Sequence, residues 1–283
     1  MSIRPSSDLA TWTASFHGAA IPVLAATAEE LALLAEAEAQ RGDVDAHQLA
    51  DPVGRDPLMT LRLLATVARI RRARAGGDER SAPETVTAAL VMMGIGPFFR
   101  AFAALPTVEA LLRAQPTALM GLRRVIRRAH RAANFALGFA VHRMDEDAAV
   151  VQLAALLHDF AEMLLWCHAP GLALEIERRQ QEDLALRSAL AQRQVLGIEL
   201  HPLQQSLMRA WALPELLVRV SDDNQAGHPQ VQSVVLAVRL ARHTEDPLRG
   251  WANPAVPDDL AAIGQLLKLS APATLKLLHD IDD

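Results

Sequence analysis

The chain has 283 residues, of which 51% are hydrophobic and only 4% aromatic, and it contains no Tyr; strands draw on β-branched and aromatic side chains, so this composition favours helices. The formal net charge of −5 gives no basic excess of the kind that neutralises nucleic-acid phosphates, so nucleic acid is not expected as a partner. A single cysteine, Cys167, excludes an internal disulfide and a cysteine-based zinc site.

The N-terminal segment, residues 1–20, mixes Ser, Thr and Pro without periodicity and is predicted to be irregular. It has no apolar stretch of signal-peptide length. No later segment approaches the run of about 18 uninterrupted apolar residues that crosses a bilayer. We therefore expect a cytoplasmic protein without a membrane-embedded segment.

Helices are predicted from Ile21-Pro22 onward. The first is rich in Leu, Ala and Glu and ends near Gly42, and Asp43 is a candidate cap for the next. Asp56 is predicted to cap a third helix, with Pro57 at its first position.

The middle of the chain contains its clearest loop and its best internal boundary. The charged segment 71–83, with two adjacent glycines, is predicted to be a loop. A short helix over 84–93 is closed by Gly94, and an apolar helix is expected over 98–115. Because a proline disfavours helix at the residue before it, Gln115-Pro116 is the predicted boundary between two halves.

The second half begins with a long helix over 117–144, which has an apolar face and an arginine-rich face. Asp145 or Asp147 is expected to cap the following helix, 148–166. That helix is hydrophobic nearly all round and is predicted to be the central buried helix.

Further helices are expected over 172–196, 202–211 and 231–243, with two small ones near the C-terminus. The predicted fold is thus all-α. Four segments are expected: the irregular start 1–20, an N-terminal helical subdomain 21–115, a second helical subdomain 116–245 packed against it, and small C-terminal helices in 246–283.

The most informative string is LAALLHDFAEMLL, residues 153–165, because it places His158 and Asp159 within an apolar helix. An ionised carboxylate there is costly to desolvate without a partner. An adjacent His-Asp pair, preceded by a histidine on an earlier helix, resembles the way in which the HD superfamily gathers metal ligands for phosphoester hydrolysis. His130 supplies that earlier histidine, so a metal in such a site would be held by His130, His158 and Asp159.

The resemblance extends over roughly residues 20–245 to the HDOD domain, the HD-related output domain of bacterial signalling proteins. It implies a multi-helix HD-like bundle and a regulatory role. The pieces that carry it are the Asp56-Pro57 step with its Leu-rich helix, Met93-Gly94, LLHDFAEMLL, LGIELHPLQQSLMRAWALP at 196–214, and LAVRLAR at 236–242.

Several departures from the HD pattern argue against catalysis. HD enzymes place their last metal ligand, an aspartate, where LAVRLAR has Val238, which offers no ligand atom. The Gly-Lys that usually follows the His-Asp pair is Ala161-Glu162, so a cation has become an anion. Where many relatives have two histidines, this chain has Asp223-Asn224.

We therefore expect His130, His158, Asp159 and Val238 to form a degenerate cluster without catalytic residues, metal or other cofactor. Residues expected to contribute to a pocket are Glu162, His201, Asp223, Asn224 and Arg239.

The leading hypothesis is a non-catalytic signalling module that binds a partner protein or a small ligand. The alternative is a metal-dependent phosphohydrolase acting on nucleotides or cyclic dinucleotides, with His201 or Asp223 as an unorthodox fourth ligand. A third hypothesis is binding of a nucleotide second messenger without cleavage, with Arg123, Arg127 or Arg239 meeting phosphates. A homodimer is compatible with the sequence.

Overall fold

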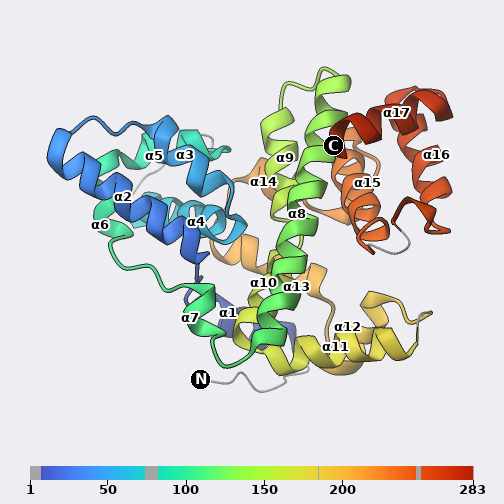
Figure 1. Ribbon diagram of the computed structural model, residues 1–283, viewed down its shortest axis with the longest axis horizontal. Helices are drawn as coiled ribbons and strands as arrows, with labels where there is room; N and C mark the ends of the chain where they lie inside the picture. Colours follow the sequence, from blue (N-terminus) through green and yellow to red (C-terminus); the bar gives the residue numbers. More distant parts are fainter. Residues whose placement is uncertain (1–7, 74–81, 184, 247–249, 283) are drawn as a thin grey trace. The chain divides into compact units, whose positions relative to one another are not determined.

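The computed structural model describes residues 8–73, 82–183, 185–246 and 250–282. Within these ranges the chain is helical, which confirms the predicted all-α class, and its only β-type pairing is an isolated parallel bridge between Val23 and Thr107 (Figure 1). Contacts divide the chain into two compact units. The first contains Met1–Val125 and Asp159–Pro214, and the second contains Ile126–His158 and Glu215–Asp283.

Helix α8 begins at the predicted boundary, at Pro116, and belongs to both units, because the division falls within it between Val125 and Ile126. The two units are defined by contacts alone. The domain limits expected from the sequence therefore stay predictions. The first unit holds the start of α8 and these helices: α1 Leu9–Gly18, α2 Ala25–Arg41, α3 Ala46–Gly54, α4 Pro57–Ala73, α5 Val86–Met93, α6 Ile95–Ala101, α7 Val108–Leu111, α10 Phe160–His168, α11 Pro170–Glu182, α12 Ser188–Leu196 and α13 Leu200–Ala210.

Helix α1 corrects the prediction of an irregular start. The Asp8 carboxylate accepts hydrogen bonds from the backbone N–H groups of Ala10 and Thr11, which caps the helix. Trp12 and Phe16, one turn apart, are both buried, and the Trp12 indole donates to the Leu196 carbonyl oxygen at 3.2 Å. This buried pair fixes α1 against its unit, so packing supplies the order that the polar composition conceals. Residues 1–7 lie outside the described residues.

The next helices follow the predicted pattern with one shifted cap. Helix α2 ends at Arg41 and is capped by Gly42, which has the left-handed φ of 65°. Helix α3 is capped by Asp45, whose side chain and that of Gln48 form a reciprocal capping box. The predicted cap Asp43 instead pairs with Arg41 at 3.0 Å. Asp56 caps α4 as expected, and the predicted loop 71–83 lies largely outside the described residues, with α4 extending to Ala73.

The prediction of one helix over 98–115 is wrong. Helix α6 ends at Ala101, and only the short α7, Val108–Leu111, follows before α8. Pro106 lies between them, and a proline restricts the residue before it to extended conformations. The backbone there is extended enough for the Pro106 carbonyl oxygen to accept from Val23 N–H at 2.9 Å.

The helix predicted over 172–196 is also divided, into α11 and α12. Asp183, after the end of α11, is extended, and its carboxylate accepts from the backbone N–H of Ala185 at 2.9 Å. Aspartate competes for backbone hydrogen bonds in this way and favours turns over helix interiors. The charged pattern across the break hid this turn from the sequence analysis.

The second unit contains the rest of α8 (Pro116–His142), α9 Ala148–Leu156, α14 Glu215–Val220, η2 Asp223–Gln225, α15 Pro229–His243, η3 Gly250–Ala252, α16 Val256–Leu267 and α17 Ala271–Asp282. Helix α9 packs against α14 and α15, and α16 packs against α15 and α17. The two C-terminal helices were expected from the sequence. Their contacts make 246–283 part of the second unit.

The predicted central helix 148–166 is two helices. Helix α9 ends at Leu156, residues 157–159 form a turn, and α10 begins at Phe160. His158 and Asp159 therefore lie in the turn between two helices and not within one helix.

The stretch Ala148–His168 is, among the described residues, the one helical stretch long and apolar enough to cross a membrane by length and composition. Of its most apolar window, 78% is buried inside the protein. Core helices meet the same criteria, because a helix that is hydrophobic all round is buried in protein or in lipid.

Candidate functional site

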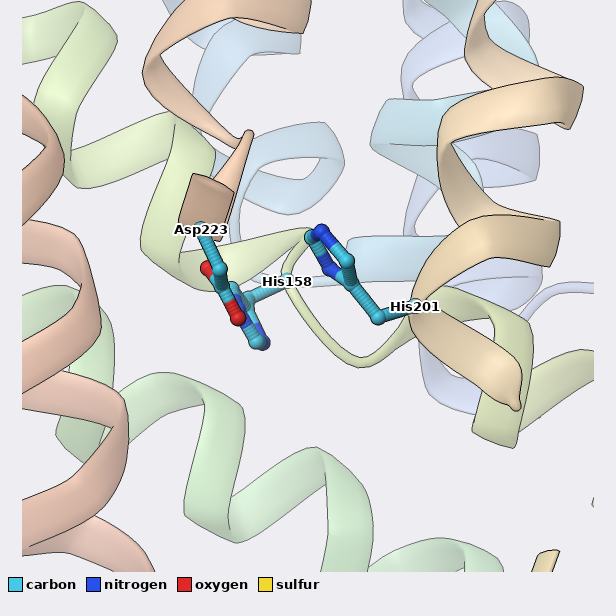
Figure 2. A group of neighbouring side chains, drawn as sticks. All are labelled: His158, His201 and Asp223. Atoms are coloured by element: carbon cyan, nitrogen blue, oxygen red, sulfur yellow. The ribbon is translucent and has the colours of Figure 1, made fainter. Parts of the chain in front are cut away.

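The candidate site is centred on His158, in the turn that separates α9 from α10. Its side chain is 9% exposed, and the imidazole Nε2 lies 3.1 Å from Oδ1 of Asp223. Figure 2 shows these two side chains facing each other. Asp223 is more accessible, with 38% of its side chain exposed. The pair thus joins a buried imidazole to a carboxylate that reaches solvent.

Local structure explains why these two residues meet. The break after α9 turns the chain at His158, whose N–H donates to the Ala155 carbonyl oxygen at 3.3 Å. Asp223 opens η2, where the Asp222 carboxylate accepts from the Asn224 N–H at 3.2 Å and holds the short helix. Helices α14 and α15 pack on either side of η2, and both also pack against α9. Two helix ends of the second unit therefore converge on one hydrogen bond.

The other predicted site residues of the second unit lie as follows. His130 is half-buried on α8, and Val238 is buried on α15 with 4% exposure. Asn224 is exposed, and its side-chain amide donates to Asp222 at 3.0 Å. Arg239 is 45% exposed and donates to the buried Asp259 carboxylate at 2.6 Å. Its guanidinium is therefore committed to a helix-helix ion pair between α15 and α16.

Three predicted site residues belong to the first unit. Asp159 occupies the N-cap position of α10, and Glu162 lies in the first turn of that helix, where a negative charge is favoured. His201, the third side chain labelled in Figure 2, is half-buried in the first turn of α13. The start of α13 is fixed by Gln192, whose side-chain oxygen accepts from the Leu200 N–H at 3.0 Å.

The arginine face of α8 is less solvated than its sequence pattern indicates. The Arg128 side chain is 9% exposed and pairs with Glu245 at 3.1 Å. Arg131 makes two hydrogen bonds to the Asp282 carboxylate, at 2.8 and 2.7 Å. Of the arginines proposed to meet phosphates, Arg123 is 53% exposed and pairs with Glu109 at 3.3 Å.

The HDOD domain family matches residues 21–226. The chain belongs to this family. The match covers the pieces quoted in the sequence analysis up to and including α13, together with α14 and η2. The predicted membership of the HDOD family is therefore confirmed.

Solved structures confirm the HDOD fold. The MmoQ response regulator of Methylococcus capsulatus is similar to the chain with a TM-score of 0.66 and 19% identity, covering 93% of this chain and 99% of its own. A virulence factor of Campylobacter jejuni gives a TM-score of 0.63 and 15% identity, covering 97% of this chain and 98% of its own. No curated protein matches the sequence.

The HD ligand set does not fit the residues of this HDOD chain. The sequence resemblance predicts the last ligand at Val238, which lies outside the matched residues 21–226 and is a buried side chain without a ligand atom. Among the described residues, groups of three or more neighbouring metal-ligand side chains include neither His130 nor Asp159. A hard divalent cation needs several anionic or carbonyl oxygens, and the HD pattern here lacks the carboxylate that α15 would supply.

One residue that sequence reasoning missed is Asp259, fully buried on α16 and contacted by Arg239 and His243. The spacing of Arg239 and His243, four residues apart on α15, is the signal that could have found it, because such residues share one helix face. Nothing in the local pattern around Asp259 identifies its partners, since they come from another helix.

Proposed function

We propose that this HDOD chain is a non-catalytic regulatory module of a bacterial signalling system, which binds a partner protein or a small ligand in the cytoplasm. The observation that carries the proposal is the burial of Val238 at the place where an HD enzyme needs its last carboxylate. A side chain without a ligand atom at that position cannot hold the cation that polarises a phosphoryl group.

The His158–Asp223 hydrogen bond supports a structural role for the remaining cluster. It connects the end of α9 to η2, the short helix between α14 and α15. Because His158 is buried and Asp223 is partly exposed, a ligand or partner that engages Asp223 changes the hydrogen bonding of a core side chain. Such a link suits a module that transmits a binding event.

A hydrolysis screen tests the proposal. Untagged protein is incubated with nucleoside triphosphates, nucleoside diphosphates and cyclic dinucleotides in Mg²⁺ and in Mn²⁺, and products are separated by chromatography. We expect no turnover above the level of the His158→Ala variant. Turnover that requires the metal and disappears in His158→Ala would overturn the proposal.

The second candidate is a metal-dependent phosphohydrolase, and the His158–Asp223 pair is what favours it. An imidazole nitrogen and a carboxylate oxygen lie 3.1 Å apart, and both atom types bind divalent transition metals. Thermal unfolding in Mn²⁺ or Zn²⁺ tests whether the pair binds a metal, because an ion that binds only the folded state raises the melting temperature. A rise that is lost in both His158→Ala and Asp223→Asn supports the enzyme reading.

Binding of a nucleotide second messenger without cleavage remains compatible with the proposed module. Arg127 is exposed on α8, and Arg123 and Arg239 already pair with carboxylates. Thermal-shift measurements with nucleotides test this version, and Arg127→Gln should remove any stabilisation that depends on that guanidinium. A shift that survives in Arg127→Gln excludes Arg127 from the contact.

A further inference from the structure

The buried carboxylate of Asp259 holds two side chains of α15 in place within the second unit. Its Oδ1 accepts a hydrogen bond from Nη2 of Arg239 at 2.6 Å, and its Oδ2 lies 2.5 Å from Nδ1 of His243. Arg239 and His243 are four residues apart on α15 and therefore share one face of that helix. One carboxylate of α16 thus fixes a guanidinium and an imidazole beside each other.

The contact with Asp259 decides which nitrogen of His243 carries the proton. A carboxylate accepts hydrogen bonds, so Nδ1 of His243 donates, and the neutral ring keeps its lone pair on Nε2. The His243 side chain is 32% exposed. Among the described residues Nε2 has no hydrogen-bond partner, and it is not one of the enclosed polar atoms. The nucleophilic nitrogen of this imidazole therefore reaches solvent.

His243 differs in this respect from four other histidines of the chain. His158 also meets a carboxylate, but its side chain is only 9% exposed. His47, His142 and His228 are exposed, and within the described part of the chain they have no carboxylate at hydrogen-bond distance. Orientation by a buried carboxylate and access to solvent therefore occur together at His243.

The charges beside His243 come from both helices. Asp259 is fully buried, and the guanidinium of Arg239 offsets its negative charge. The pair therefore does not repel an anionic reagent as an isolated carboxylate would. Glu245 is engaged by Arg128 at 3.1 Å. The other charged residues near His243 in sequence or on the facing helix are exposed: Arg242, Asp246 and Asp258.

We propose that His243 is a modification site, at which Nε2 accepts a phosphoryl group from a small acyl phosphate. The Nε2 lone pair attacks phosphorus and forms the N–P bond, while the bond between phosphorus and the acyl oxygen breaks and the carboxylate leaves with its electron pair. The proton stays on Nδ1, hydrogen-bonded to Asp259. The negative charge of Asp259 stabilises the imidazolium that forms, as the aspartate of a catalytic triad does.

The inference goes beyond the proposed function, because it assigns a modification site at a place distant in sequence from His158. The phosphoryl group adds negative charge where α15 packs against α16, which gives the proposed regulatory module an input. Metal-dependent turnover that requires His158 would refute the proposed function and leave the labelling of His243 unchanged. The two proposals therefore fail separately.

Labelling resolved by residue tests the inference within one molecule. The untagged full chain is incubated with acetyl phosphate at neutral pH, and the phosphorylated fraction of each histidine is followed over time by mass spectrometry without acid, which cleaves the N–P bond. We expect His243 to be labelled at least about tenfold faster than His47, His142 and His228, because they lack an orienting carboxylate. Equal rates at the four histidines, or no labelling of His243, would overturn the proposal.

Two matched variants test the part played by the carboxylate. Asp259→Asn removes its charge and should slow the labelling of His243 by about tenfold, with the rates at His47 and His142 unchanged. Asp258→Asn makes the same change at the exposed neighbour and should leave the rate at His243 within about twofold. An unchanged rate in Asp259→Asn would contradict the proposal. Circular dichroism verifies that both variants fold, and if Asp259→Asn does not, the comparison of histidines in the unmodified chain still decides.

Discussion

Among the residues that the structure describes, each unit contains one fully buried aspartate, and the two are supported in different ways. Asp56 in the first unit accepts hydrogen bonds from the backbone N–H groups of Leu24, Leu58 and Met59, at 2.7 to 3.1 Å. Asp259 in the second unit is held by the side chains of Arg239 and His243. Backbone donors are fixed by the fold, whereas these side chains are partly exposed and can return to water. A buried carboxylate therefore requires hydrogen-bond donors. Whether these donors are backbone or side-chain groups determines how much stability is lost when the carboxylate is removed.

The largest effect is expected for a third carboxylate placed at a buried position that now holds an apolar side chain. Val238→Asp puts an acid at a position with 4% exposure, and we expect the free energy of unfolding to fall by about 3 kcal/mol or more. Urea denaturation measures the change, and Val238→Thr is the isosteric control with a smaller loss. Full recovery of stability in Mn²⁺ would show that the HD ligand set is intact apart from this residue.

The next largest effect is expected for Asp56→Ala. The substitution leaves the N–H groups of Leu24, Leu58 and Met59 buried without an acceptor, so unfolding should become easier by about 2 kcal/mol. Urea denaturation again reports the loss. Asp51→Ala is the control, because the Asp51 side chain is 69% exposed and pairs only at the surface with Arg55. Equal effects of the two substitutions would contradict the role given to backbone donors.

The pH dependence of Asp56 sharpens the same point. Burial raises the pKa of this carboxyl above its ordinary value of 3.8, and the hydrogen bonds from Leu24, Met59, Thr27 and Leu58 oppose the rise. A folded-state pKa above the unfolded one contributes stability that is present below pH 3.8 and lost as pH rises through the folded pKa. Relative to Asp56→Asn, the unmodified chain should therefore gain stability as the pH is lowered through that window. A difference that does not change with pH would contradict the raised pKa.

A smaller effect is expected at the Asp259 ion pair, and its size depends on whether the carboxylate or its partner is replaced. Asp259→Asn leaves Arg239 and His243 free to hydrate, since their side chains are 45% and 32% exposed. Arg239→Met leaves the buried carboxylate with one partner and should cost more, about 1 kcal/mol. Thermal unfolding of both variants tests the order. If Asp259→Asn is the more destabilising, desolvation of the carboxylate is not the controlling cost.

The smallest effect is expected for the His158–Asp223 pair. Because 38% of the Asp223 side chain is exposed, a double-mutant cycle with His158→Ala and Asp223→Ala should give a coupling of about 0.5 kcal/mol in the free energy of unfolding. Urea denaturation of the four proteins provides the cycle. A coupling near zero would mean that the hydrogen bond does not link α9 to η2 in solution.

The sequence predicted what depends on neighbouring residues. Asp56 was recognised as a helix cap because its donors lie two and three residues ahead. The third donor, Leu24, could not be predicted, because it comes from the start of another helix. The same limit applies to Asp259, whose partners lie on α15. Two predicted helices were too long because the local signals that end them, Pro106 and Asp183, were given less weight than the helical pattern around them.

At the candidate site, the sequence identified the residue types and the family but not their pairing. His158 and Asp159 were expected within a helix, and an apolar stretch from 148 to 166 gives no local sign of the turn between α9 and α10. Asp223 was expected near a pocket, and the structure places it as the partner of His158. That pairing spans 65 residues and results from the packing of α14 and α15 around η2.

Elemental analysis of the untagged protein, purified without chelators and dialysed against metal-free buffer, tests the central claim most directly. We predict less than one tenth of an equivalent of any transition metal in the unmodified chain, and the same content in His158→Ala. One equivalent of a metal that is retained through dialysis and lost in His158→Ala would contradict the account of a family member whose ligand set no longer supports catalysis.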